Sequence, residues 1–493
     1  MTDSDSASSD MTALSRRDFL VVSAGFMIAP RCAAAGSRAQ VIVVGAGIAG
    51  LTAALELTRQ GVDVILLERE AQPGGRFRSV LFDGVAANLG SQWVNAGISP
   101  LVDSFLERIP LQTIGGRDGG MALVWDGKMI EVGGENFLAG IPFSEKVKQD
   151  FVASVVRMKR DAAALYPGVD FAGAKSWDYV FDLPMGTPLW KKLEAMTIAE
   201  YLAGFDPVVT TIWGTRVSAG FGGTPDTISA LFLVGWYRGA PFFPMTILKG
   251  GNHRLTDEMA AALEARGRNI RYRSEVTGIT QNAASVTVTC RNGQIYTADY
   301  CIDTTPAPVA KQIIRGLSPA KEAALGALSY VPLTSLALHV RNFPDADRLS
   351  GALFVGGHTA AFVNQTGAVA GHPGEGTVIL VVVTDPAKTG LPDKELLTLA
   401  GRDLKTVRPS FDMNRDLLGY EAKEWRVGEV HVSPGFLSKY HRILAEPAGR
   451  IYFGGEYVSA FPTWGGAVRG AQKAVSDILR VSGAPAKGPG QSG

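Results

Sequence analysis

The chain has 493 residues, more than a single hydrophobic core usually organises, so we expect two domains. Its 48 lysines and arginines nearly balance its 47 aspartates and glutamates, which leaves a formal net charge of +1 and excludes the strongly basic surface of a nucleic-acid-binding protein. Three cysteines are too few for a disulfide framework, and their spacing fits no metal site.

Residues 1–36 have the pattern of a twin-arginine export signal. A polar start leads to Arg16 and Arg17, an apolar run follows up to Ala29, and three alanines stand at positions 33–35. The apolar run is too short to span a bilayer stably, so we interpret it as a removable address. The segment predicts a protein that is exported in folded form to the periplasm and has no membrane span.

Residues 41–50 read Val-Ile-Val-Val-Gly-Ala-Gly-Ile-Ala-Gly, an apolar strand that enters a glycine turn and opens a helix. This arrangement is typical of a dinucleotide-binding βαβ unit. Gly45 allows the tight turn, Gly47 lets the backbone approach a pyrophosphate, and Gly50 lets the helix pack on the strand.

The predicted helix begins at Ile48 and Ala49, where unpaired N–H groups and the helix dipole attract a phosphate. A second strand over residues 62–68 ends in Glu68, whose carboxylate can accept hydrogen bonds from a ribose. Arg69 follows directly and is assigned to the same site. The order of these features predicts a Rossmann-type α/β domain that binds a dinucleotide.

A second glycine turn, Gln72-Pro73-Gly74-Gly75-Arg76, lies just beyond the ribose-binding acid. With this turn, the region resembles the extended FAD fingerprint of the flavin amine oxidase superfamily, which includes monoamine and polyamine oxidases and nicotine oxidoreductases. The resemblance implies that Gly74, Gly75 and Arg76 touch the diphosphate and the flavin side of FAD. A guanidinium suits a diphosphate because it offers two parallel charge-assisted hydrogen bonds.

Residues 89–94, Leu-Gly-Ser-Gln-Trp-Val, resemble the family segment that runs beside the flavin. The resemblance assigns Gly90, Ser91, Gln92 and Trp93 to the cofactor site, and Trp93 to the catalytic site as well. Trp93 stands where an arginine would bind the carboxylate of an amino-acid substrate, so a free amino acid is not the expected substrate.

The resemblance also predicts a discontinuous domain organisation. Residues 37–96, 247–310 and 425–482 are expected to form the FAD-binding domain, 97–246 and 311–424 a discontinuous α+β substrate-binding domain, and 483–493 a disordered tail. Val276 opens an alternating strand of a small β-meander, and by family analogy its backbone would bond the adenine.

The two insertions are expected to shape the substrate cavity. The first is mostly helical, with an amphipathic candidate over residues 144–165. Its later part is rich in aromatic residues that build either core or cavity: Phe221, Phe232, Trp236, Tyr237, Phe242 and Phe243. The second contains apolar strand runs over residues 335–340 and 378–383, which suit a cavity floor.

Residues 449–456 form a short apolar strand that ends in glycines and Glu456, and a helix is expected to begin near residues 465–468. The resemblance implies that Gly455 and Glu456 bond cofactor hydroxyls, while Gly466, Ala467 and Val468 bring the helix N-terminus to the flavin pyrimidine ring. That helix end would stabilise the negative charge of reduced flavin. No cysteine stands just before this motif, so FAD is expected to be non-covalent.

Four residues are assigned to the reacting side of the flavin: Trp425, Trp464, Trp93 and Leu338. Trp425 matches the tryptophan that precedes the last glycine strand, and Trp464 is one half of an aromatic cage whose other half is replaced by Ala467. Leu338 is interpreted as standing where relatives have a lysine that holds a water at flavin N5. Loss of that lysine favours a cytochrome or quinone over O2 as the electron acceptor.

These features predict an FAD-dependent oxidoreductase that oxidises the C–N bond of a small hydrophobic amine. Hydride transfer to flavin N5 would give an imine that hydrolyses. One alternative is C–C desaturation of an apolar substrate, as in the carotenoid-desaturase and protoporphyrinogen-oxidase branches, and another is a flavin-binding protein without turnover. No metal or nucleic acid is expected, and a homodimer stays open because oligomeric state leaves no readable trace.

Overall fold

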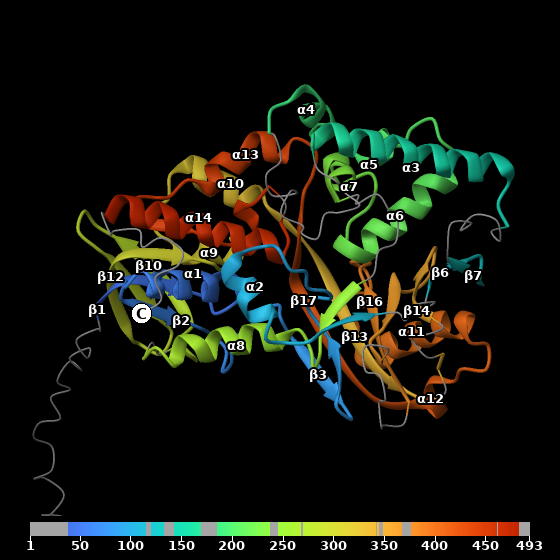
Figure 1. Cartoon of the computed structure of the whole chain (residues 1–493), viewed down its shortest axis with the longest axis horizontal. Coiled ribbons are helices and arrows are strands. Elements are labelled where there is room, and N and C mark those ends of the chain that lie inside the picture. The colour runs from blue at the N-terminus through green and yellow to red at the C-terminus, as the bar shows by residue number, and fades with distance from the viewer. Residues whose placement is uncertain are drawn as a thin grey trace, which may run out of the picture.

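The computed structural model describes residues 38–114, 120–132, 142–168, 185–236, 245–267, 270–341, 343–344, 349–366, 376–460 and 462–482. The expected export signal, the expected disordered tail and the aromatic residues Tyr237, Phe242 and Phe243 lie outside these ranges. The described residues form two large sheets with helices packed around them (Figure 1).

The first sheet contains the predicted dinucleotide-binding unit. Its strand order is β10-β11-β12-β1-β2-β9, with β18 pairing to the free side of β12 at one end. The strands are β1 (Arg38–Val44), β2 (Val64–Leu67), β9 (Ile270–Arg271), β10 (Val276–Gln281), β11 (Val286–Cys290), β12 (Ile295–Asp303) and β18 (Ile451–Phe453).

The parallel strands at the centre of this sheet end at one edge. Val44 lies opposite Leu67 on one side and Asp303 on the other, and Phe453 lies opposite Asp303. The side chains at positions 41–44 of β1 are buried on both faces, as expected for a strand covered by helices. The carboxyl edge of such a sheet is where doubly wound folds bind their ligands.

Helices cover this sheet in the left half of Figure 1. Helix α1 (Ile48–Arg59) packs against α14 (Trp464–Ser482) and α8 (His253–Glu264). Three further helices belong to the same half: α9 (Ala307–Ile313), α10 (Pro319–Ala327) and α13 (Phe436–Ala445). Helix α9 packs on β10, and α10 packs on α9 and α13.

The second sheet has the order β17-β13-β16-β15-β14-β6-β7. Its strands are β6 (Gly120–Trp125), β7 (Lys128–Val132), β13 (Ser329–Val340), β14 (Leu349–Phe354), β15 (Ala361–Asn364), β16 (Thr377–Val383) and β17 (Leu417–His431). Apolar side chains of α11 (Asp393–Val407) pack on one face. The hairpin of β3 (Ser79–Phe82) and β4 (Val85–Asn88) packs on the other.

A group of helices lies above the second sheet in Figure 1. It contains α3 (Glu145–Leu165), α4 (Pro188–Glu194), α5 (Ile198–Tyr201), α6 (Pro207–Phe221) and α7 (Ala230–Trp236). Helix α3 begins where the periodicity over 144–165 predicts, because the Ser144 side chain accepts the Val147 N–H. The remaining elements are α2 (Pro100–Leu106), β5 (Leu111–Ile114), β8 (Met245–Leu248), α12 (Met413–Asp416) and the 3-10 turn η3 (Glu456–Val458).

The sheets place two domain boundaries differently from the sequence prediction. Residues 425–431 belong to β17 and therefore to the second sheet, and residues 311–328 carry helices that pack beside the first sheet. The pairing of β17 with β13 over most of its length explains the first difference, since strand pairing is not visible in a local pattern. None of the helices in the described part of the chain is long and apolar enough to cross a membrane.

Candidate functional site

The two glycine turns at residues 45–50 and 74–76, together called the opening motif, touch each other. Gly45 has φ +98°, and a Cβ on Gly50 would lie 1.8 Å from the Gly45 carbonyl oxygen, so both positions require glycine. The Gly74 N–H donates to Ala46 O at 2.8 Å. A Cβ on Gly47 would meet no atom within 4 Å. The protein leaves open space at Gly47, where the motif predicts a pyrophosphate.

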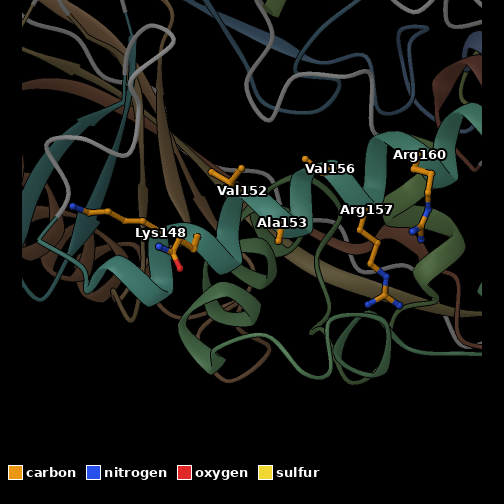
Figure 2. Close-up of a pocket in the computed structure, with 7 residues that line it drawn as sticks. Lys148, Val152, Ala153, Val156, Arg157 and Arg160 are labelled. Carbon is orange, nitrogen blue, oxygen red and sulfur yellow. The ribbon is translucent and has the colours of Figure 1, made fainter.

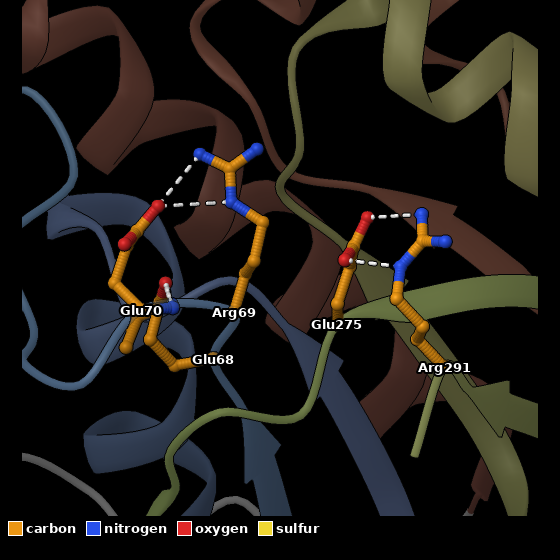
Figure 3. Close-up of polar contacts among 6 residues, drawn as sticks. Glu68, Arg69, Glu70, Glu275 and Arg291 are labelled. Carbon is orange, nitrogen blue, oxygen red and sulfur yellow. Dashed lines mark hydrogen bonds and ion pairs between the residues drawn. The ribbon is translucent and has the colours of Figure 1, made fainter. Parts of the chain in front are cut away.

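Glu68 stands at the carboxyl end of β2, as the sequence predicts. Its carboxylate accepts the N–H groups of Ala46 and Glu70, both at 2.7 Å, and it is 8% exposed (Figure 3). The bond to Ala46 ties the acid directly to the glycine turn. Glu68 therefore lies beside the turn with a fixed orientation.

Figure 3 also shows Arg69 and Glu275, which are the sequence neighbours of Glu68 and Val276, the residues predicted to contact the ribose and the adenine. The Arg69 side chain is 66% exposed and pairs with Glu70 at 2.9 Å. Next to the buried Val276, Glu275 accepts both Nε and Nη2 of Arg291 at 2.5 and 2.8 Å. Arg69 thus lies at the rim of the site, while Val276 lies in the sheet.

Arg76 joins the opening motif to the second sheet and to the closing motif, which consists of residues 449–456 and the helix start at residues 465–468. Its Nη1 donates to Gly428 O on β17 at 2.8 Å, and its Nη2 lies 2.7 Å from Glu456 Oε1. Burial alone would lower the pKa of Arg76, but Glu456 and Glu429 raise it above its usual value. Arg76 is a permanent cation at the carboxyl edge of the first sheet.

The segment after β4 lies between Arg76 and Trp425. The Ser91 N–H donates to Arg76 O at 2.8 Å, and a Cβ on Gly90 would lie 1.7 Å from the same oxygen. Trp425 donates its indole N–H to Leu89 O at 2.7 Å. The structure therefore brings together Gly90, Ser91 and Trp425 as the resemblance implies.

Gln92 and Trp93 continue this segment. The Gln92 amide nitrogen donates to the carbonyls of Asn88 and Gly90 at 2.7 and 2.8 Å, which fixes the side chain. Trp93 is partly buried, and its carbonyl accepts the Ser91 hydroxyl at 3.2 Å.

The closing motif ends on the same edge. A Cβ on Gly470 would lie 2.8 Å from Gly455 O, so α14 packs directly on this turn. The Thr463 hydroxyl accepts the Gly466 N–H at 3.4 Å, and the Thr463 carbonyl accepts the Ala467 N–H. Val468 is fully buried. Helix α14 thus begins with its N-terminus at the carboxyl edge of the first sheet.

Trp464 is the first residue of α14. Its ring packs edge-on against Phe77, with centroids 5.9 Å apart. Phe77 follows Arg76, and Trp425 lies beside the same loop through Gly90. The two predicted tryptophans therefore come from distant parts of the chain to neighbouring positions, Trp464 on Phe77 and Trp425 beside Gly90 and the Arg76 backbone.

Leu338 lies on a different face of β13 from the one predicted. Its side chain is fully buried in the apolar cluster that contains α11 residues such as Leu396. Its neighbour Ala337 packs instead with Leu89. Because strand side chains alternate between faces, Ser335 and Ala337 face the hairpin of β3 and β4, and Leu338 faces away. The assignment of Leu338 to the reacting side is corrected accordingly.

A buried amide network that sequence reasoning missed joins the two sheets. Asn88 Oδ1 accepts the Ser79 hydroxyl and the Asn252 N–H, both at 2.8 Å, and its Nδ2 donates to Gln365 Oε1 at 3.2 Å. Asn252 also donates to Ser91 O at 2.9 Å. In the sequence, the only feature that marks these residues is that amide side chains stand within apolar segments.

Sequence reasoning also missed two acids with raised pKa values, the fully buried Asp303 and the partly buried Glu429, of which Glu429 interacts electrostatically with Arg76. Burial raises the pKa of Asp303, at the end of β12, to about 7, and burial raises the pKa of Glu429, on β17, to about 7. Both acids are remote from the glycine motifs in sequence, and no local pattern marks them.

Two hollows lie outside this motif cluster. One, of about 780 Å³, runs along the outer face of α3 beside the exposed Val152 and Val156 and the cationic Lys148, Arg157 and Arg160 (Figure 2). The other, of about 990 Å³, lies between α6 and the ends of β13 and β16, and Tyr330 is part of its wall. Within the described ranges, no cluster of histidine, cysteine and acidic side chains could hold a metal ion.

The residues present fit an FAD molecule. Gly47 has free space beside it, Glu68 is oriented next to it, and Arg76, Glu456 and the N-terminus of α14 share one edge of the sheet. These are the donors and acceptors that a ribose, a diphosphate and an anionic flavin ring require.

Comparison with known proteins agrees with this fit. A polyamine oxidase of Oryza sativa subsp. japonica, polyamine oxidase 4, is 25% identical over 466 residues, which cover 88% of this chain and 86% of that protein. An L-amino acid dehydrogenase of Synechocystis sp. is 26% identical over 473 residues, which cover 90% of this chain and 94% of that protein.

The fold comparison gives the same answer. The structure of wild-type putrescine oxidase bound to putrescine superposes with a TM-score of 0.72 at 20% identity, covering 90% of this chain and 99% of that one. The predicted fold class, the FAD cofactor and the enzyme class are confirmed. Residues 48–479 match the family of flavin containing amine oxidoreductases, and the chain belongs to that family.

Proposed function

We propose that this protein is an exported, FAD-dependent oxidoreductase that oxidises the C–N bond of a hydrophobic amine. Bound FAD supplies a hydride acceptor at N5, and the product is an imine that water hydrolyses. The observation that carries the proposal is that Trp464 packs on Phe77 while Trp425 lies beside Gly90, which packs on the Arg76 backbone next to the glycine turns.

The roles of the side chains follow from this position. Aromatic rings exclude water, and a water-poor site favours the uncharged amine, whose lone pair is needed for C–N oxidation. Trp425 is held by its bond to Leu89 O, and Trp464 by its packing on Phe77, so neither ring turns freely. Held rings orient the reacting carbon of a bound amine.

The experiment is an anaerobic titration of the purified holoprotein with a panel of amines, read at the oxidised flavin absorption band. Hydrophobic primary, secondary and cyclic amines should bleach the band, and free amino acids should not. Bleaching by polyenes or porphyrinogens instead would favour the desaturase alternative. A band that no substrate class bleaches would favour a flavin protein without turnover.

We further propose that a cytochrome or a quinone, and not O2, takes the electrons. The residues of β13 that face the hairpin of β3 and β4 include Ser335 and Ala337, and neither is a lysine. Stopped-flow mixing of substrate-reduced protein with air-saturated buffer tests this. We expect reoxidation over minutes, and reoxidation within milliseconds would contradict it.

Export by the twin-arginine route remains a proposal based on Arg16 and Arg17. Changing both to lysine should leave the full-length protein in the cytoplasmic fraction with FAD bound. Unchanged periplasmic accumulation of the Arg16→Lys, Arg17→Lys variant would contradict the assignment.

A further inference from the structure

The Arg76 guanidinium contacts one carboxylate, that of Glu456, and interacts electrostatically with a second acid, Glu429, where β17 passes the glycine turns. Arg76 Nη2 lies 2.7 Å from Glu456 Oε1, and Arg76 Nη1 donates to Gly428 O. Glu429 is the next residue of β17 and pairs across the ladder with Val331 of β13. The cation supplied by the opening motif is therefore shared between the closing motif and the second sheet.

The charges of this cluster do not balance at every pH. Burial raises the pKa of Glu429 to about 7, Arg76 lowers it and Glu456 raises it. Arg76 stays charged throughout the physiological range. Arg76 and Glu456 form an ion pair at 2.7 Å, so ionisation of Glu429 adds a further negative charge beside this pair as the pH rises through neutrality.

Among the described residues, two tyrosines and one acid with raised pKa values also belong to the surroundings of this cluster. Tyr330 of β13 and Tyr457 of η3 have pKa values raised well above 10 by burial, so both stay neutral. Asp303 of β12 has its pKa raised to about 7 by burial, and its Oδ1 accepts the Thr305 hydroxyl at 2.8 Å. Asp303 is thus the group from which Glu429 must be distinguished.

We propose that Glu429 is a third charged member of the cofactor cradle and that protonation of its carboxyl group strengthens FAD binding. FAD carries a negatively charged diphosphate, and Arg76 follows the glycine pair that contacts Gly47. An ionised Glu429 adds negative charge beside the cation that offsets the diphosphate. By linkage, FAD binding near neutral pH takes up a proton, because the bound anion raises the affinity of Glu429 for it.

The test measures FAD binding to the full-length apoprotein by quenching of flavin fluorescence at pH 6 and pH 8. The wild-type Kd should rise between about three- and tenfold from pH 6 to pH 8, the tenfold limit corresponding to a shift of one pKa unit. Glu429→Gln should bind with a Kd close to the wild-type value at pH 6, at both pH values.

Glu424→Gln is the matched control. Glu424 lies on the same strand, its side chain is 35% exposed, and it pairs with Arg426 at 3.2 Å. This variant should keep the wild-type pH dependence. If Glu429→Gln keeps that dependence too, or if Asp303→Asn removes it, the assignment to Glu429 is wrong.

A second measurement covers the case in which Glu429→Gln does not fold. Calorimetry of FAD binding to wild-type apoprotein at pH 7, in two buffers of different ionisation enthalpy, reports the number of protons exchanged. We expect net uptake of a fraction of one proton, and no uptake or net release would overturn the proposal. Neither measurement involves an amine, so failure of the proposed substrate class would leave both results intact.

Discussion

At the scale of single residues, Gly47 and Gly50 stand on the same turn but differ in what surrounds them. A Cβ at Gly50 would lie 1.8 Å from a backbone oxygen, whereas a Cβ at Gly47 would meet no protein atom within 4 Å. Gly50 is therefore required by the packing of the helix on the strand, whereas Gly47 is required by the pyrophosphate expected to bind beside it.

Substitution by alanine should separate these two requirements. The apoprotein of Gly47→Ala should fold with a melting temperature within about 2 °C of wild type, because alanine lowers the conformational entropy of the unfolded chain and meets no clash in the folded one. Its Kd for FAD should nevertheless rise at least about tenfold. Gly50→Ala should give no folded protein. Gly220→Ala on α6 also meets no neighbour and is the control that keeps both properties. Normal FAD binding by Gly47→Ala would contradict the assignment of the pyrophosphate to this turn.

Titration of Asp303 should make the free energy of unfolding of the apoprotein depend on pH. Its folded pKa of about 7 lies above the unfolded value of 3.8, so the folded state binds the proton more tightly. The contribution of this group is fully present below pH 3.8 and is lost as the pH rises through 7.

Asp303→Asn should remove this dependence. Relative to wild type, the free energy of unfolding of the variant should rise from pH 5 to pH 8 by up to about 3 kcal/mol, because the roughly two pH units between 5 and the folded pKa contribute about 1.4 kcal/mol each. Urea unfolding of the two apoproteins at four pH values measures the difference. A difference that is constant from pH 5 to pH 8 would show that Asp303 does not titrate in this range.

At the scale of secondary-structure elements, β17 joins the second sheet to the cofactor site. It pairs with β13 over most of its length, and its inner side contacts the opening motif through Trp425 and Gly428. The Trp425 indole N–H satisfies the carbonyl of Leu89, at the start of the segment that carries Gly90 and Ser91. Order in β17 and order beside the flavin should therefore depend on each other.

Trp425→Phe should lower the free energy of unfolding by about 1–2 kcal/mol, because the Leu89 carbonyl loses its donor. It should also shift the absorption spectrum of bound flavin. Trp190→Phe is the control: Trp190 is buried, and among the described residues its indole nitrogen has no hydrogen-bond partner. Equal effects of the two substitutions on the flavin spectrum would argue against a role of Trp425 at the cofactor.

At the scale of the whole molecule, buried polar contacts join the second sheet to the half of the molecule that contains the first sheet. Asn88, Asn252 and Gln365 are fully buried and come from β4, the start of α8 and the end of β15. Their hydrogen bonds tie the two parts of the molecule together, although among the described residues the Gln365 Nε2 has no hydrogen-bond partner.

Asn88→Ala should lower the free energy of unfolding by about 3 kcal/mol, because it removes the acceptor of the Ser79 hydroxyl and the Asn252 N–H and one of the two donors to Gln365 Oε1. Excess FAD should stabilise both folded proteins by mass action, so the loss should be the same with and without FAD if the variant binds FAD as tightly as wild type. Asn292→Ala, in the exposed hairpin between β11 and β12, should change stability by less than about 0.5 kcal/mol. Thermal unfolding of wild type and of the two variants, with and without FAD, measures these differences in stability.

Particular residues mark how far the sequence alone could predict this protein. The spacing of Gly45, Gly47 and Gly50 and the acid Glu68 determine the turn, the first helix and the cofactor, because backbone geometry and local hydrogen bonding act over a few residues. Apolar alternation predicted that β13 is a strand but not which of its faces meets the cofactor, and Leu338 was assigned to the wrong one.

Tertiary structure alone decided what depends on contacts between distant segments. Arg76 and Gly428 are separated by 352 positions, and only the folded chain sets Glu429 beside them. The same holds for the Asn88 network and for the pKa of Asp303. Burial and the field of neighbouring charges are properties of the packed interior, and a linear pattern of residue types does not contain them.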